Sequence, residues 1–284
     1  MVVGFWFHQP TTIHQQPSTL SLDYYLAMIH LRSVRVRNPE ALPDGYPFDL
    51  PIIRALNELE LTAPVTFLVG ENGSGKSTLL EGIAASANLP TIGSVAIERD
   101  ETLTAAQSLG RHLVLSWASR SHRGFYMRSE DFFGFGLSTQ RAIAELGEIA
   151  ETFEEGSYAH ATVMAQRQAL EKKYGELNAR SHGEGFFQVF AERFTPGGLY
   201  LLDEPEVALS PQRQIALLAL MMETVAQEAQ FVIATHAPML MAYPGAQILH
   251  LSEEGIREQQ WDEVEHVQMT RAFLTDPDQF LRHL

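Results

Sequence analysis

The sequence predicts an α/β fold with a mostly parallel sheet, an N-terminal antiparallel β region and an inserted helical lobe. Short apolar runs rich in β-branched residues alternate with longer stretches of helical spacing, as strand–helix units do. A glycine cluster separates the first clear strand from the first clear helix. Of 284 residues, 45% are hydrophobic and 19% charged, which is near the average for globular proteins. This length fits one large domain or two small ones.

Charge and cysteine content exclude several classes of function. The chain has 20 Lys and Arg against 35 Asp and Glu, a formal charge of −15, which argues against a general electrostatic attraction to nucleic acid or acidic lipid. A local basic stretch remains, formed by Arg111, Arg120, Arg123 and Arg128. A solvated face is its default interpretation, and nucleic-acid contact is the alternative. The lack of cysteine excludes disulfides, thiolate metal sites and a cysteine nucleophile.

The N-terminal segment has no features of a targeting sequence. Residues 1–23 are rich in Pro, Gln, Thr and His without periodicity, and we expect an irregular arm there. The apolar run near the start has no preceding Lys or Arg, so we expect no export signal. Another long apolar stretch, residues 215–222, is far shorter than the roughly 18 residues of a membrane span. We expect a cytoplasmic protein without direct membrane insertion.

The expected elements follow in chain order. Alternation predicts a half-buried strand over residues 33–37, and residues 65–69 form a β-rich run that precedes a helix from Lys76 to Ala84. Further strands are expected at 199–202, 231–234 and 248–251, with a helix over 211–228. We therefore divide the domain, residues 24–284, into a β region and first core segment (24–138), a helical lobe (139–194) and a final segment (195–284).

The glycine cluster matches the pattern G-x-x-x-x-G-K-[ST] and lies between a strand and a helix, the context that a phosphate-binding loop requires. Its glycines allow the backbone to wrap a polyphosphate, and the helix N-terminus presents unpaired N–H groups. We expect Lys76 to neutralise the phosphates and Ser77 to reach Mg²⁺. The predicted nucleotide-binding residues here are Gly70, Glu71, Asn72, Gly73, Ser74, Gly75, Lys76, Ser77 and Thr78.

Two adjacent acids, Asp203 and Glu204, end the apolar run at 199–202. Because neighbouring strand residues point in opposite directions, one acid can face a metal and the other a water. We expect Asp203 to hold Mg²⁺ and Glu204 to orient the water that attacks the γ-phosphate. Acids at strand ends are also common as solvated turn residues.

Two further segments complete the expected site. Thr235 and His236 follow the strand at 231–234, so His236 lies at the carboxyl end of the sheet, where α/β folds bind ligands. We expect His236 to contact the γ-phosphate or the attacking water. Ser181 and Glu184 form the pattern of a capping box that begins a helix, and a capped helix N-terminus with nearby glycines also binds anions.

Together these segments resemble ABC-type P-loop ATPases. The shared motifs are Walker A (residues 70–78), a signature at Ser181-His-Gly-Glu-Gly, Walker B (199–204), a D-loop (208–210) and a switch histidine, His236. The runs VTFLVGENGSGKSTLLEGIA, SHGEGFF and LYLLDEPEVALSP most resemble free-standing ATPases assigned to the AAA family but built like ABC or recombination-repair heads.

The resemblance implies ATP and Mg²⁺ as cofactors and a homodimer in the ATP state. Two copies would dock head to tail, so that Ser181 and Gly183 of one meet the γ-phosphate bound by Lys76 of the other. The separation of Lys76 from Ser181 is too short for the long coiled coil of chromosome-maintenance relatives. Glu130 is the candidate for the glutamine that usually follows the strand before the helical lobe, and Tyr46 and Phe48 are candidates to stack on adenine.

The predicted function is a Mg²⁺-dependent ATPase whose dimer closure acts on a nucleic acid or protein, in DNA maintenance or defence. The signature begins Ser-His-Gly and Glu206 stands where transporters have Thr, departures that point away from transport. One alternative is the nucleotide-binding subunit of a transporter, and another is a non-hydrolysing ATP-gated scaffold. A P-loop small-molecule kinase would leave Ser181, Glu204 and His236 unexplained.

Overall fold

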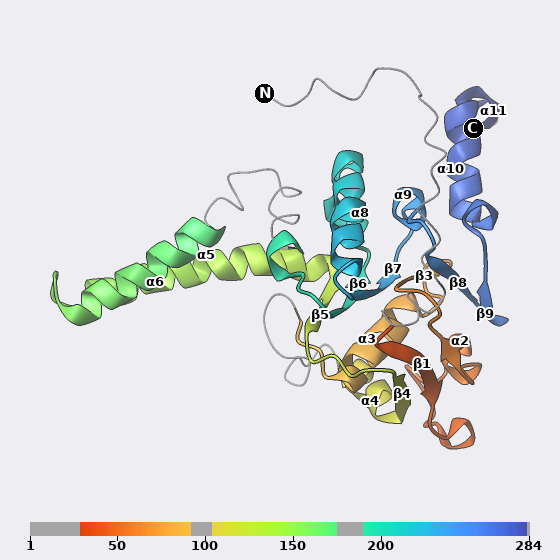
Figure 1. Ribbon diagram of the computed structural model, residues 1–284, viewed down its shortest axis with the longest axis horizontal. Helices are drawn as coiled ribbons and strands as arrows, with labels where there is room; N and C mark the ends of the chain where they lie inside the picture. Colours follow the sequence, from red (N-terminus) through yellow and green to blue (C-terminus); the bar gives the residue numbers. More distant parts are fainter. Residues whose placement is uncertain (1–28, 92–103, 175–189, 283–284) are drawn as a thin grey trace.

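The structure is a computed structural model that describes residues 29–91, 104–174 and 190–282 (Figure 1). The arm predicted for residues 1–23 and the signature at 181–185 lie outside these ranges. For residues 130–140, which include Glu130, the structure describes the backbone but not the side chains.

Elements up to the helical lobe are β1 (Leu31–Val36), η1 (Pro39–Ala41), α2 (Pro51–Arg54), β2 (Leu59–Glu60), β3 (Val65–Val69), α3 (Lys76–Ala87), α4 (Thr104–His112), β4 (Leu113–Trp117) and β5 (Gly124–Arg128). The remaining elements are α5 (Ser129–Glu151), α6 (Tyr158–Tyr174), β6 (Leu199–Asp203), η5 (Pro205–Ala208), α8 (Pro211–Val225), β7 (Gln230–Ala234), α9 (Pro238–Met241), β8 (Gln247–Ser252), β9 (Gly255–Glu258), η6 (Trp261–Glu263), α10 (Glu265–Thr275) and α11 (Pro277–Leu281).

Among the described residues, the main sheet has the strand order β5-β6-β7-β3-β8-β9. Every neighbouring pair is parallel except β8 and β9, which form an antiparallel hairpin. The predicted α/β fold with a mostly parallel sheet is therefore confirmed. The strands predicted at 65–69, 199–202, 231–234 and 248–251 correspond to β3, β6, β7 and β8.

The sheet is buried on both faces: its central strands β3, β6 and β7 are mostly apolar, and every residue in them is buried. In β3, Phe67 packs on one face with α8 and α9, whereas Leu68 packs on the other with α3. In β7, Ile233 and Val232 divide between the same two faces. This two-sided burial fixes the carboxyl ends of the strands relative to one another.

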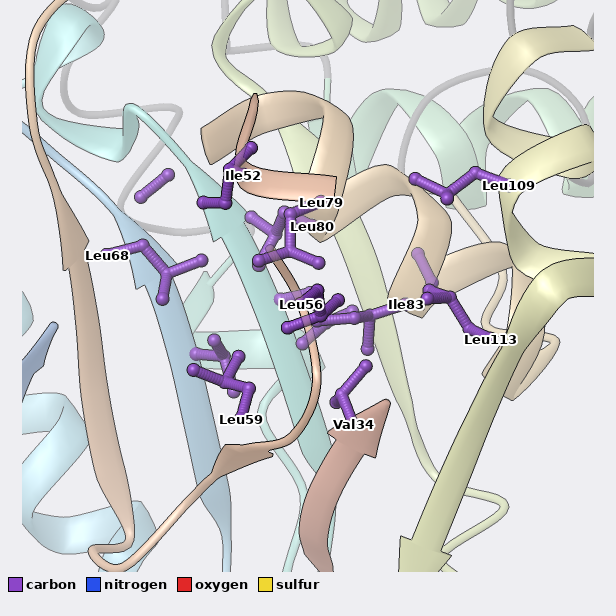
Figure 2. Close-up of a cluster of buried hydrophobic side chains, with 14 of the residues drawn as sticks. Val34, Ile52, Leu56, Leu59, Leu68, Leu79, Leu80, Ile83, Leu109 and Leu113 are labelled. Atoms are coloured by element: carbon purple, nitrogen blue, oxygen red, sulfur yellow. The ribbon is translucent and has the colours of Figure 1, made fainter. Parts of the chain in front are cut away.

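Figure 2 shows the second of these faces, where Leu79, Leu80 and Ile83 of α3 pack between the sheet and the N-terminal strands. Leu109 of α4 packs against α3 on the side away from the sheet. A Cβ atom at Gly82 would lie 2.7 Å from Cδ2 of Leu109, so the two helices approach closely only because this residue is glycine. The helix that follows the glycine loop is therefore held firmly on both sides.

The N-terminal β region is a separate antiparallel sheet in the order β2-β1-β4. The strand predicted at 33–37 is β1, but its longer partner β4 lies after α4 and was not among the predicted strands. Val36 of β1 pairs with Leu113 of β4. This sheet covers the outer side of the core that surrounds α3.

The helical lobe is a hairpin of α5 and α6 that projects away from the sheet (Figure 1). Helix α5 begins at Ser129, directly after β5, ten residues before the boundary predicted for the lobe. The described part of the chain contains no helix that is both long and apolar enough to cross a membrane.

Candidate functional site

The carboxyl ends of three adjacent strands bring the predicted site residues to one edge of the sheet. Strand β3 pairs with β7, and β7 pairs with β6, all in parallel, with Asp203 beside Ala234 and Ala234 beside Leu68. The main-chain N–H of Glu204 donates to the carbonyl of Ala234 at 2.9 Å, and that of Thr235 donates to Leu68 at 3.2 Å. These bonds continue the sheet for one residue past the strand ends and fix the start of each loop.

The glycine loop has the backbone that a phosphate cradle needs. Gly70 has φ +147° and Gly75 has φ +94°, and a Cβ atom at Gly75 would lie 2.6 Å from Cγ2 of Ile52. A Cβ atom at Gly70 would collide with the carbonyl oxygen of Leu251. Helix α3 then begins at Lys76 with no side-chain cap, so its first N–H groups are available to an anion.

Lys76 is held inside this loop and is only 5% exposed. Its Nζ donates to the carbonyls of Gly70 at 2.9 Å and Glu71 at 2.8 Å. Burial lowers the pKa of Lys76, and the carboxylates of Glu204 and Asp203 oppose that shift. The loop carbonyls thus keep the ammonium group near the centre of the cradle.

Ser77 and Asp203 form a compact pair of oxygen ligands. The hydroxyl of Ser77 donates to Oδ1 of Asp203 at 3.1 Å, although 126 positions separate the two residues. Burial raises the pKa of Asp203 to about 6, and the Ser77 hydrogen bond partly opposes that shift. A hydroxyl and a carboxylate fit Mg²⁺, which takes one or two protein ligands and completes its shell with water and phosphate oxygens.

Glu204 does not continue the alternation of β6. The strand ends at Asp203, and Glu204 has φ 48° and ψ 51°, a left-handed conformation that is costly for a non-glycine residue. Strand alternation, from which we predicted that the two acids point in opposite directions, therefore does not extend to Glu204. Oε1 of Glu204 lies 3.8 Å from Nε2 of His236.

His236 lies at the same edge, immediately after β7, as predicted from its position in the sequence. Burial lowers the pKa of His236, the charges of Lys76 and His266 lower it further, and Glu204 opposes the shift. The imidazole is therefore mainly neutral near pH 7 and carries a single ring proton.

Two residues at this edge were not predicted as site residues. The carboxylate of Glu206 accepts the main-chain N–H of His236 at 2.7 Å, and burial raises its pKa. His266 of α10 lies against His236, with 3.3 Å between its Nε2 and Nδ1 of His236. The third acid of the run Asp-Glu-Pro-Glu could have indicated Glu206, whereas no local pattern marks His266.

The remaining predicted residues lie around the same loop or outside the described ranges. Thr78 hydrogen-bonds the hydroxyl of Tyr46 at 3.0 Å, while Asn72, Gly73 and Ser74 line a cavity of about 610 Å³. Tyr46 is 61% exposed and stays the candidate to stack on adenine, but Phe48 is buried at 3% exposure against His112 and is therefore not the adenine-stacking aromatic. Ser181, Gly183 and Glu130 fall in the parts whose side chains the structure does not describe.

Comparison with known protein families and curated proteins gives a consistent result. A family model described as "AAA domain" matches residues 52–87, which include the glycine loop and most of α3. Cobalt import ATP-binding protein CbiO from Salmonella paratyphi A is 26% identical over 192 residues, 66% of this chain and 67% of that protein. The protein of the same name from Salmonella typhimurium is 26% identical over 190 residues, 66% of each.

Solved structures that match include an ATP-binding cassette in a dimeric post-hydrolysis state with ADP and phosphate. That match has a TM-score of 0.43 and 16% identity, and covers 82% of this chain and 98% of that one. An ATP-binding subunit of an ABC transporter matches with a TM-score of 0.41 and 18% identity, and covers 86% of this chain and 93% of that one.

Proposed function

We propose that this chain, which is an ABC-type P-loop ATPase, hydrolyses ATP with Mg²⁺ at the edge formed by β3, β6 and β7, between two copies of itself. The observation that carries the proposal is the hydrogen bond from Ser77 to Asp203, 3.1 Å long. It joins the start of α3, directly after the glycine loop, to the acidic end of β6, which is separated from β3 in the sheet by β7. A nucleotide in the loop would therefore meet a cation ligand, an acid and a histidine together.

The loop binds the triphosphate through its backbone. The N–H groups at the start of α3 and the glycine turns face the phosphates, as in other helix N-terminal anion sites. Lys76 exchanges its contacts with the carbonyls of Gly70 and Glu71 for the β- and γ-phosphates. The Lys76 side chain is buried inside the loop that would hold these phosphates.

Ser77 and Asp203 would hold Mg²⁺, which neutralises charge on the β- and γ-phosphates when it is bound. The Ser77 hydroxyl and the Asp203 carboxylate lie within hydrogen-bonding distance of each other. Asp203 is only 7% exposed, so it offers its oxygens in a defined direction. Burying a charged carboxylate away from water is unfavourable, and a bound cation would offset that cost for Asp203.

Glu204 and His236 are placed to act on the attacking water and the γ-phosphate. The Glu204 side chain is 37% exposed and open to the edge, whereas Asp203 beside it is buried. An acid that accepts a proton must reach water, and Glu204 does. His236 would donate a ring hydrogen bond to the γ-phosphate or to that water.

A phosphate-release assay tests these roles. We expect Glu204→Gln to lower the turnover rate by a factor of about 10² to 10⁴, while ATP binding is retained. Lys76→Ala should lose nucleotide affinity. Glu223→Gln, an exposed acid on α8, is the matched control and should leave both unchanged. Full activity of Glu204→Gln, or unchanged affinity of Lys76→Ala, would refute the assigned roles.

The dimer is supported by the signature-like run at 181–185, through which Ser181 and Gly183 of a second copy would complete each site. Mixed-subunit experiments test this arrangement. Ser181→Arg and Lys76→Ala protomers should each be inactive alone, and their mixture should regain at most one working site per pair. No recovery on mixing would count against shared sites.

A transporter subunit is the second candidate function, and the similarity to the cobalt import ATP-binding protein favours it. In that case the chain would copurify with a membrane protein, although it lies in the cytoplasm. The role in DNA maintenance or defence stays a prediction. Recovery of bound material with the ATP-loaded Glu204→Gln protein separates the two: a membrane protein favours transport, and nucleic acid favours the DNA role.

A further inference from the structure

A second histidine lies directly against the predicted switch histidine. Nδ1 of His236 and Nε2 of His266 are 3.3 Å apart, and the two rings meet edge to face with centroids 4.9 Å apart and an interplanar angle of 68°. In this geometry an N–H in the plane of one ring can point at a ring-nitrogen lone pair of the other. One ring donates and the other accepts.

The contact comes from a well-anchored segment. Trp261 of η6 donates its indole N–H to the carbonyl of Pro238 at 3.0 Å, two residues after His236. Val264 and Val267, on either side of His266, are buried in the same core as Leu240 of α9. The C-terminal segment is therefore fixed against the loop that carries His236.

The charges around His236 favour one of these two arrangements. The groups that face it are Glu204 from the end of β6, Lys76 from α3 and His266 from α10, with Glu206 on its main-chain N–H. Its Nε2 is buried, lies 3.8 Å from Oε1 of Glu204 and has no hydrogen-bond partner among the described residues. A carboxylate at that distance favours a proton on Nε2 over a lone pair.

A neutral His236 with its proton on Nε2 has a lone pair on Nδ1, and Nε2 of His266 is the group that faces it. We propose that His266 is a positioning residue that donates its Nε2–H to Nδ1 of His236 and so fixes the His236 tautomer whose Nε2–H points to Glu204. The catalytic consequence rests on the proposed function, since that Nε2–H is the group that would meet the γ-phosphate. The tautomer itself is a property of the nucleotide-free protein.

The test is the ring-nitrogen spectrum of the full chain labelled with ¹⁵N-histidine at pH 8, above the usual histidine pKa of about 6.5. A His236→Gln variant assigns the His236 signals. In the wild type we expect a protonated Nε2 and an unprotonated Nδ1. His266→Phe, which keeps a ring but has no donor, should give a mixture of tautomers.

Two more variants separate donation from packing. His266→Lys can only donate and should keep the wild-type tautomer, whereas His266→Glu can only accept when ionised and should move the His236 proton to Nδ1. Thr270→Ala, at an exposed position of α10, is the control and should leave the spectrum unchanged. A wild-type His236 protonated on Nδ1, or an unchanged tautomer in His266→Phe, would overturn the inference.

A kinetic measurement keeps this inference separate from the proposed function. With saturating MgATP, His266→Phe should lower kcat about fivefold to tenfold, the effect of one hydrogen bond, with little change in KM. His266→Lys should recover most of that loss. If His266→Phe changes the tautomer but not kcat, the tautomer assignment stands and the catalytic role of His236 is refuted.

Discussion

The main-chain N–H of His236 donates a 2.7 Å hydrogen bond to Oε1 of Glu206, which joins the loop after β7 to the loop after β6. The two residues are 30 positions apart, and their loops carry different parts of the candidate site. Burial raises the pKa of Glu206. This carboxyl group therefore sets the backbone position from which the His236 ring extends.

Removal of that acceptor should loosen the loop after β7, which carries His236. We expect Glu206→Ala to lower the free energy of unfolding by about 1–3 kcal/mol, because the His236 N–H loses its partner, and to lower kcat. Glu206→Gln keeps an acceptor oxygen and should remain within about 1 kcal/mol of the wild type. Urea denaturation and phosphate release check both. Equal stability and turnover of the alanine and wild-type proteins would show that the bond does not position the loop.

Asp203 should make the nucleotide-free protein less stable above pH 6. Its pKa is raised by burial from 3.8 to about 6, so the native state favours the protonated acid, and that stabilisation is lost as the pH rises through 6. Asp203→Asn should therefore be more stable than the wild type by up to about 3 kcal/mol at pH 8, and nearly equal to it at pH 4.

Urea denaturation of both proteins at the two pH values, without nucleotide or Mg²⁺, measures this difference. The asparagine variant should at the same time lose Mg²⁺-dependent turnover. A stability difference that stays constant with pH would contradict the assigned burial effect.

The left-handed backbone conformation of Glu204 should lower the free energy of unfolding of the protein. Asparagine adopts the left-handed backbone more readily than glutamate does. We expect Glu204→Asn to gain about 0.5–1 kcal/mol in the free energy of unfolding, whereas Glu204→Gln should gain nothing. Both variants should lose turnover. Thermal unfolding separates them, and equal melting temperatures would argue against backbone strain at this position.

The packing of α3 on α4 makes a prediction about the core. Gly82→Ala should destabilise the protein by about 1–3 kcal/mol, because the added methyl group meets Leu109. In a Leu109→Ala background the same change should cost much less. A double-mutant cycle in urea measures this coupling. Additive costs would mean that the two side chains do not compete for the same space.

The parts of the fold that could be predicted from the sequence are those with a complete local pattern. Residues 65–69 are a mostly apolar, β-rich run that precedes a glycine loop, so β3 and α3 follow from their own residues. Residues 113–117, LVLSW, are also mostly apolar, but no local pattern marks them as the partner of β1, which lies some 80 positions upstream.

The candidate site divides in the same way. Asp203 and His236 are predictable as residues at strand ends, because parallel strands bring their carboxyl ends to one edge. The left-handed turn at Glu204 and the contact of His266 with His236 depend on tertiary packing. Neither has a spacing or composition that distinguishes it within one sequence.

The mass of the Glu204→Gln protein with ATP and Mg²⁺ tests the central claim most directly. Sedimentation velocity should show a species of twice the 31.7 kDa chain mass when ATP and Mg²⁺ are both present. It should show a monomer when either is omitted, or when the same chain also carries the Lys76→Ala substitution. Two ATP molecules should be recovered per dimer. A Glu204→Gln protein that binds ATP fully and remains a monomer at every concentration would contradict the account.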